Sequence, residues 1–228
     1  MGDEHGDIWD ACRPVHKVEV SAFYMGKYQV TQRLWQAVMG SNPSRFKEER
    51  RPVEQVSWDD IQPFLKKLNA LAEVADALRQ HGLRPGFRLP TEAGWEYAAR
   101  GGRHSQGFRY AGSDDPAQVA WYDKNSGNQT HEVGLLLPNE LGLHDMSGNV
   151  WEWCNDRWGG KEYYEACKKK GIQKDPTGPV GGGGRVGRGG GYFSGPLRCR
   201  PAYRYITSPG HRSSDLGFRL ALPFQSVG

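Results

Sequence analysis

The C-terminal part of this sequence lacks five residue types that are common before it. From Asp175 to Phe224 there is no Lys, Glu, Gln, Met or Trp. Instead, short motifs that contain glycine and arginine (RGGG, CRPA, LGFRLA) alternate with mixtures of Tyr, Phe, Ser, Thr, Ile, His and Asp. This restricted residue composition, interrupted by short motifs, distinguishes the segment from the rest of the chain.

The sequence also lacks the marks of a secreted, membrane or zinc-binding protein. Its four cysteines, Cys12, Cys154, Cys167 and Cys199, show no C-x-x-C spacing, so we expect reduced or structural thiols. No apolar run is long enough to cross a bilayer, and we expect no membrane insertion. The N-terminal stretch MGDEHGDIWDACRP is acidic where a signal peptide is basic. We therefore expect a cytoplasmic protein as given, or one displayed on a surface through a leader or partner that this chain does not contain.

Sequence signatures of catalysis are absent as well. There is no G-x-S-x-G or H-E-x-x-H, and the glycine run 182–187 lacks the strand and helix that a dinucleotide site requires. Glu92 and Glu96 lie one helical turn apart, but Arg100 continues the same face. We therefore expect a solvated, ion-paired surface there and not a pair of catalytic carboxylates.

The composition is that of a globular domain. Of the 228 residues, 37% are apolar and eight are Trp, which is ample for a packed core. No linker separates two cores, so we expect a single domain over residues 1–228. The net charge of +4 comes from basic and acidic residues mixed along the chain, and Lys168 to Lys170 is typical of a solvated loop. We therefore expect no nucleic-acid binding.

Helical periodicity is confined to the first half of the chain. It occurs in TQRLWQAVMG, in residues 57–82 and in LPTEAGWEYAARGG, which begin with the N-cap candidates Thr31, Ser57 (with Asp60 as a capping box) and Thr91. The glycines after the first and third stretches mark helix ends. The sequence thus predicts two or three helices.

The rest of the chain favours strands and loops. The alternating stretch HKVEVSAFYMGKYQV predicts two short strands with a turn near Met25. Beyond Arg103, Gly, Pro, Asn, Asp and Ser interrupt brief apolar pieces, of which MSGNVWEWC and LGFRLAL are the best strand candidates. The predicted fold class is α+β, with a small, mostly antiparallel sheet and long loops.

The loop LGLHDMSGNVWEW offers hard oxygen ligands. Asp145 and Glu152 supply carboxylates, and Gly148 and Val150 supply carbonyl groups of the kind that calcium binds. In the alternative interpretation, Asp145 and Asn149 bond the local backbone of a turn while the tryptophans fill the core. The residues alone leave both interpretations open.

Seven stretches together resemble one known family, the formylglycine-generating-enzyme-like (sulfatase-modifying-factor) domain. They run in register from about Val18 to Leu222: FYMGKYQVTQRLWQAVMGSNPS, RPVEQVSW, FRLPTEAGWEYAARGG, YAGS, PNELGLHDMSGNVWEWC, RVGRGG and LGFRLAL. The resemblance implies a C-type-lectin-like fold of the loop-rich variety. It does not settle the function, because members of that superfamily have different activities.

Oxidase members of the family carry two cysteines, five residues apart, that bind copper and activate oxygen. In RGGGYFSGPLRC the corresponding positions are Ser194 and Cys199. One thiolate does not make a two-sulfur copper site, so the departure argues against oxidase activity. A divergent oxygen-dependent oxidase that uses Cys199 is the competing hypothesis, and it requires a second thiol close to Cys199 in space.

The calcium loop matches the family pattern position by position. The resemblance therefore implies structural calcium at Asp145, Gly148, Val150 and Glu152. We expect no other cofactor to be required.

One branch of the superfamily accounts for the missing residue types. The frame from Gly187 to Leu222 resembles the variable region of a diversity-generating retroelement protein, in which template adenines are miscopied into the 3′ end of the gene. Randomising the adenines of AAY codons gives NNY codons, which never encode Lys, Glu, Gln, Met or Trp. The resemblance implies a non-enzymatic binding protein with a variable region at 187–222.

The same resemblance implies which residues vary. The diversified, ligand-binding positions are Phe193, Ser194, Gly195, Arg198, Tyr203, Tyr205, Ile206, Thr207, His211, Ser213, Ser214 and Asp215, with Tyr192 and Leu197 as marginal members. The fixed positions are Arg188, Cys199, Arg200, Arg204, Arg212 and Phe218. Aromatic residues give rigid contact area and small hydroxyl residues give adaptable hydrogen bonds, as in antibody loops. We expect a macromolecular ligand, a protein; a structural module without a ligand site is a third hypothesis.

Overall fold

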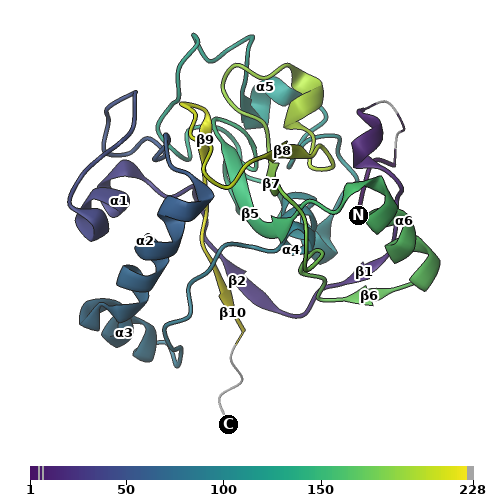
Figure 1. The fold of residues 1–228 in the computed structure, drawn as a ribbon. Coiled ribbons are helices and arrows are strands. Elements are labelled where there is room, and N and C mark those ends of the chain that lie inside the picture. The colour runs from purple at the N-terminus through teal and green to yellow at the C-terminus, as the bar shows by residue number, and fades with distance from the viewer. Residues whose placement is uncertain (5, 7, 225–228) are drawn as a thin grey trace.

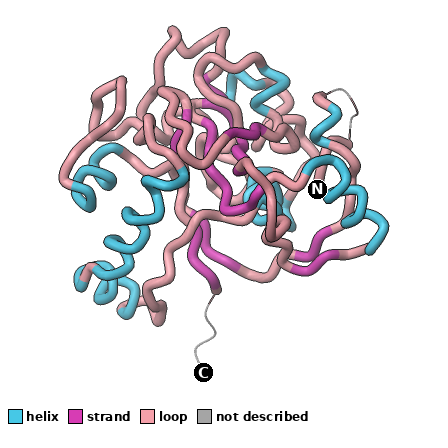
Figure 2. Tube along the Cα trace, viewed as in Figure 1, coloured by secondary structure: helices cyan, strands magenta, loops and turns pink. Residues whose placement is uncertain are grey.

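The computed structural model describes residues 1–4, 6 and 8–224, and the last four residues of the predicted domain, 225–228, lie outside the described part. Short helices and strands are joined by long loops (Figures 1 and 2). No helix in the described residues combines the length and apolar character needed to cross a bilayer.

A four-stranded sheet lies near the middle of the molecule (Figure 1). Its strand order is β8 (Tyr205–Thr207), β7 (Arg185–Arg188), β5 (Trp151–Arg157) and β9 (Leu216–Gly217). β5 pairs antiparallel with β7, β7 pairs antiparallel with β8, and β5 runs parallel to β9. The prediction that MSGNVWEWC and LGFRLAL supply strands is confirmed, and the two strands lie side by side.

Three two-stranded sheets surround it: β2 (Phe23–Met25) antiparallel to β10 (Ala221–Pro223), β1 (Val18–Glu19) parallel to β6 (Gln173–Lys174), and β3 (Ala120–Trp121) parallel to β4 (Ser147–Gly148). The N-terminal stretch thus contains two short strands, but both β1 and β2 end at or before Met25. Each pairs with a distant segment, so the turn predicted near Met25 does not lie between the two strands.

The predicted helix starts are confirmed. α1 (Gln32–Met39) begins where Thr31 Oγ1 accepts a hydrogen bond from Leu34 N, and α4 (Glu92–Ala99) begins at the cap Thr91. Ser57 and Asp60 form the predicted capping box of α2 (Trp58–Ala70). The single helix expected over 57–82 is interrupted at Leu71, where the backbone is extended, and α3 (Ala72–Arg79) follows.

The structure has more helices than the two or three expected, and it has helices beyond Arg103, where the sequence favours loops and brief strands over long helices. The described residues form six α-helices, including α5 (Pro116–Val119) and α6 (Gly160–Lys170). α6 buries Tyr164 and Cys167, three positions apart, and ends in the lysine run that the sequence predicts as a loop. Lysines are favourable there because they interact with the helix dipole at its C-terminus. Three short 3-10 turns complete the helical structure: η1 (Asp10–Cys12), η2 (Gly102–His104) and η3 (Pro196–Cys199).

The main hydrophobic core fills the space between α1, α2 and the four-stranded sheet. Trp35 of α1 stacks on Phe64 of α2, with ring centroids 5.0 Å apart, and the edge of Phe218 packs against both rings. Trp151 and Trp153 of β5 belong to the same core. The face of the sheet that lies toward α1 and α2 is therefore closely packed.

Candidate ligand-binding surface

The positions expected to vary gather around β8, the edge strand of the four-stranded sheet. Ten of the twelve are partly or fully exposed: Phe193, Gly195, Arg198, Tyr203, Tyr205, Ile206, Thr207, His211, Ser213 and Ser214. They lie on β8, on the turn and 3-10 helix between β7 and β8, and on the loop that leads to β9. An edge strand and its two flanking loops thus present these residues to solvent, interrupted by buried positions such as Cys199 and Arg204.

Aromatic rings form the firm part of this surface. Tyr205 stacks on Trp151 of β5, with centroids 5.1 Å apart and planes inclined by 28°, and Tyr203 lies 5.8 Å from the same indole. Both tyrosines are half-buried and pack against the main core. Because one face of each ring is fixed by packing, the rings offer contact area that costs little conformational entropy on binding.

A pocket of about 310 Å³ opens among these rings. Seven of the twelve predicted residues line it: Phe193, Arg198, Tyr203, Tyr205, Ile206, Ser213 and Asp215. Its volume is at the lower end of the range for ligand sites, which suits one large side chain of a partner more than a whole cofactor. The remaining lining residues are Trp9, Trp151 and Arg204.

Trp9 lines the same pocket and is a candidate surface residue that the sequence analysis missed. It precedes η1, is 52% exposed, and its ring centroid lies 6.4 Å from that of Tyr203. The available signal was a large aromatic residue in an acidic, otherwise polar N-terminal stretch. Nothing in the sequence places that stretch beside β8, because the two segments are almost 200 residues apart.

Two of the predicted contact residues are buried instead. Ser194 is 1% exposed, and its hydroxyl accepts a hydrogen bond from Gly191 N at 3.0 Å. Asp215 is 5% exposed and accepts a hydrogen bond from the Ser213 hydroxyl, while burial raises the pKa of its carboxyl. The expectation of an exposed, ligand-contacting side chain is therefore wrong for Ser194, because its turn folds the hydroxyl back onto the backbone. Asp215 reaches the pocket only as part of its wall.

The residues expected to be fixed lie mostly inside the protein. Five of the six are buried: Arg188, Cys199, Arg200, Arg204 and Phe218. Arg212 is the exception, and it makes two 2.7 Å hydrogen bonds to the carboxylate of Asp60 on α2. Most positions expected to vary thus lie at the surface, and most positions expected to be fixed lie in the interior.

Two of the fixed arginines occupy a buried ion cluster beneath the surface. Arg188 Nη2 lies 2.6 Å from Glu92 Oε1 and 2.8 Å from Glu96 Oε2, and Arg204 Nε also donates to Glu92 Oε1. Glu96 pairs with Arg100 as the i, i+4 spacing predicts. The expectation of a solvated surface is nevertheless wrong, because Glu92 is 3% and Glu96 1% exposed. Their face of α4 packs against segments from distant parts of the chain.

The cluster is held together electrostatically. Burial by itself would raise the pKa of Glu92, but the guanidinium groups of Arg204 and Arg188 outweigh it and keep that pKa below its ordinary value. The Tyr164 hydroxyl donates to Glu92 Oε2 at 2.7 Å, and the Arg204 guanidinium lies 3.9 Å from the centroid of the Tyr164 ring. The segment that carries the variable residues is thereby fastened to α4 and α6.

The predicted calcium-loop residues also come together, around a side chain that the sequence analysis did not single out. The backbone oxygens of Asp145, Gly148 and Val150 and one carboxylate oxygen of Glu152 all lie within 3.4 Å of Gln29 Nε2. All of these residues are buried. The loop thus converges on an amide nitrogen.

The thiol groups offer little nucleophilic reactivity. All four cysteines are free and buried, as expected for reduced thiols. Burial raises the pKa of Cys199 to about 12, and the charge of Asp123 acts in the same direction. Within the described residues, His, Cys, Asp and Glu side chains form no group of three or more that would hold a metal ion.

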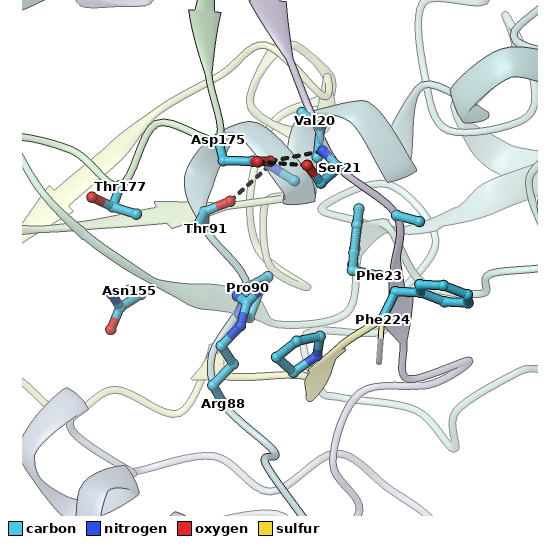
Figure 3. A pocket seen from close by; sticks show the side chains of 13 residues that line it. Val20, Ser21, Phe23, Arg88, Pro90, Thr91, Asn155, Asp175, Thr177 and Phe224 are labelled. Atoms are coloured by element: carbon cyan, nitrogen blue, oxygen red, sulfur yellow. Dashed lines mark hydrogen bonds between the residues drawn. The ribbon is translucent and has the colours of Figure 1, made fainter. Parts of the chain in front are cut away.

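A second pocket, of about 360 Å³, lies near β2 and β10 (Figure 3). Arg88, Phe23 and Asn155 are among its lining residues, and Asp175 accepts hydrogen bonds from the amide and hydroxyl of Ser21 at its rim. None of the positions expected to bind ligand lines it.

Comparison with known proteins assigns the chain to a family. The sulfatase-modifying factor enzyme 1-like domain family matches residues 1–223. The solved structure of Treponema denticola variable protein 1 is similar, with 35% identity and a TM-score of 0.81 over 97% of this chain and 90% of that one. Two curated relatives match in sequence. Chaperone protein LppX of Paenibacillus barcinonensis is 41% identical over 60% of this chain and 63% of its own length. The formylglycine-generating enzyme of Streptomyces coelicolor is 34% identical over 82% of this chain and 57% of its own length.

The chain spans less than two thirds of the length of either curated relative. The match to the solved structure nevertheless covers almost all of this chain. The fold is α+β, as predicted, of the C-type-lectin-like type found in formylglycine-generating enzymes. The protein belongs to the formylglycine-generating-enzyme-like, or sulfatase-modifying factor enzyme 1-like, domain family.

Proposed function

We propose that this protein is a non-enzymatic ligand-binding protein whose C-terminal surface is diversified by a retroelement. The observation that carries the proposal is the separation within one segment: ten of twelve positions expected to vary are at least partly exposed, and five of six expected to be fixed are buried. A binding protein needs this arrangement, because its surface must change while its interior must not.

The similarity to the Treponema denticola protein, which is named a variable protein, supports the same proposal. The absence of Lys, Glu, Gln, Met and Trp from residues 175–224 agrees with NNY coding. Trp9 and Trp151 lie outside the segment and contribute invariant aromatic rings to the pocket. The surface then combines a fixed aromatic base with variable walls.

The chemistry of the surface favours a protein ligand. Tyrosine, phenylalanine and isoleucine provide apolar contact area, and serine and threonine provide hydrogen bonds. Arg198 is the only Arg or Lys among the twelve positions, which is too little positive charge for the phosphate contacts that bind nucleic acid. A pocket of about 310 Å³ accepts a protruding side chain of the partner as an anchor.

A display experiment tests the binding capacity directly. Eight of the exposed positions are randomised with NNY codons, Tyr203 and Tyr205 are kept, and the library is selected against hen egg-white lysozyme as a defined protein target. A control library randomises the eight residues of α3, none of which is buried. We expect folded lysozyme binders from the first library and few or none from the second. Equal yields from both libraries would contradict the proposal.

The competing function is an oxygen-dependent oxidation, favoured by the similarity to formylglycine-generating enzymes. Ser194 and Cys199 stand where the oxidase members have two cysteines, and the Cys199 thiol is buried with a pKa of about 12. Titration with copper(I) against a competing chelator distinguishes the two functions. We expect no tight copper(I) binding by the wild-type protein; tight binding that is lost in Cys199→Ala would favour the oxidase.

A further inference from the structure

We propose that the side-chain amide of Gln29, and not a calcium ion, binds the oxygens of the loop 145–152. Gln29 Nε2 lies 3.2 Å from Asp145 O, 3.4 Å from Gly148 O and 3.0 Å from Val150 O. It also lies 3.0 Å from Glu152 Oε1. These are the same four residues that the family resemblance assigns to calcium. Their oxygens surround the amide nitrogen at hydrogen-bonding distance, whereas calcium requires oxygens at about 2.3–2.6 Å.

The orientation of the amide follows from its surroundings. An amide nitrogen donates two hydrogen atoms, which the four acceptor oxygens share, whereas the amide oxygen has no donor among the described residues. Turning the amide over would place its oxygen against four other acceptors. The nitrogen therefore faces the loop, as a positively polarised group in the position of a cation.

Glu152 has no capacity left for a metal. Its Oε1 accepts hydrogen bonds from Gln29 Nε2 at 3.0 Å and from Arg219 Nη2 at 2.7 Å. Its Oε2 accepts from Arg219 Nε and from Trp95 Nε1, each at 2.6 Å. Both carboxylate oxygens thus have two protein donors, which fills the lone pairs that would otherwise coordinate an ion.

The charge of the site is already balanced. Glu152 and Arg219 form an ion pair in which both side chains are 0% exposed. The carboxylate of Asp145 is engaged elsewhere, because its Oδ2 accepts a hydrogen bond from Gly134 N at 2.8 Å, and it is the backbone oxygen of Asp145 that contacts Gln29. A calcium ion would add two positive charges beside a buried guanidinium, and burying charge without a partner is strongly unfavourable.

The amide of Gln29 connects segments of the buried interior that lie beneath the proposed variable surface. Gln29 lies between β2 and α1, and Arg219 reaches from the segment after β9 to the backbone oxygens of Gly26 and His144. The loop that they hold leads directly into β5, whose Trp151 supports the tyrosines of the binding surface. The inference does not depend on the proposed function. It implies that these interior segments are held in place without calcium.

Thermal unfolding in excess EDTA and in roughly 5 mM calcium, above the Kd of even weak extracellular calcium modules, tests the inference. We expect the wild-type protein to unfold at the same temperature in both buffers. A bound structural ion would raise the midpoint by several degrees in calcium. A calcium-dependent rise of that size in the wild-type protein would overturn the proposal.

Two variants test the role of the amide itself. Gln29→Ala and Gln29→Glu remove the donor, and each is expected to lower the midpoint in EDTA by several degrees. Gln62→Ala is the matched control, because Gln62 makes one bond to Trp58 O on a partly exposed helix and its loss should change little. A Gln29 variant as stable as Gln62→Ala would refute the role of the amide. If neither Gln29 variant folds, the calcium response of the wild-type protein still decides the question.

Discussion

The ring of Tyr205 lies on the indole of Trp151, with centroids 5.1 Å apart, so that a residue of the edge strand rests on a residue of the central strand β5. This contact covers one face of the tyrosine ring, and the residue as a whole remains partly exposed. Tyr203 rests on the same indole from a different direction. The candidate binding surface thus rests on a tryptophan ring, and tryptophan is a residue type that NNY codons cannot encode.

In lysozyme binders selected as described above, Tyr203→Ala or Tyr205→Ala should abolish most of the affinity. Loss of a central aromatic anchor costs about 2 kcal/mol or more, which is roughly a thirtyfold rise in Kd. Surface plasmon resonance measures the Kd, and circular dichroism confirms the fold. Tyr97→Ala is the control, because Tyr97 is 41% exposed on α4 and does not line the pocket. Unchanged affinity in both tyrosine variants would show that the surface is wrongly assigned.

Trp9 should contribute to binding although it lies far outside the variable region. Its side chain is 52% exposed, lines the pocket and neighbours Tyr203. We expect Trp9→Ala to weaken binding by about 1–2 kcal/mol while the unfolding midpoint changes little, since about half of this residue's surface is already in water. The same plasmon resonance assay applies. An effect no larger than that of Tyr97→Ala would remove Trp9 from the site.

The buried ion cluster should be essential for stability. Arg204→Met leaves the buried carboxylate of Glu92 with one cationic partner fewer, and breaking such a pair costs about 3–5 kcal/mol. Urea unfolding measures the loss. Arg212→Met is the matched control, because both side chains of the Arg212–Asp60 pair are partly exposed, and we expect a change of at most about 1 kcal/mol. Equal effects of the two substitutions would contradict the role given to the cluster.

Glu54 should make the protein more stable in mild acid than in mild base. Burial raises the pKa of Glu54 from 4.5 to about 7, while its Oε1 accepts one bond from Phe46 N and its Oε2 none among the described residues. The folded state therefore holds a proton that the unfolded state has released. This stability is fully present below the unfolded pKa and is lost as the pH rises through the folded pKa.

Substituting Glu54→Gln removes the titration. Urea unfolding at about pH 5 and about pH 8 should show a smaller stability difference in the variant than in the wild-type protein. Some difference should remain, because burial also raises the pKa of Asp156 to about 7 and that of Asp145 to about 6. Identical pH profiles of variant and wild type would exclude Glu54 as a source of the effect.

Local features of the fold were predictable from the sequence, because their determinants are close together in the chain. Thr31, Ser57 with Asp60, and Thr91 cap their helices through bonds that span three residues. α6 escaped prediction because Gly159 and Gly160 stand at its start and resemble a loop. Its helical state depends on burial of Tyr164 and Cys167 against distant segments.

The candidate site was predictable only in part for the same reason. The residue composition, taken together with the family resemblance, pointed to the positions expected to vary, and most of them are at least partly exposed. It contained no information about which turn would bury Ser194, or about the approach of Trp9 to Tyr203. The spacing of Glu96 and Arg100 correctly indicated an ion pair. Burial of that pair depends on Arg188, which lies about 90 residues later in the chain. Arg188 is on β7, and the sheet brings it next to Glu96.

The sequence of the DNA that flanks the gene tests the central claim most directly. The account predicts a near-copy of the codons for Gly187 to Leu222 beside a reverse transcriptase gene, differing from the gene only where the copy has adenine. Those differences should fall in codons of partly exposed residues such as Tyr203, Tyr205 and Ile206. Absence of such a copy, or differences concentrated in the codons of the buried Arg188 and Arg204, would contradict the account.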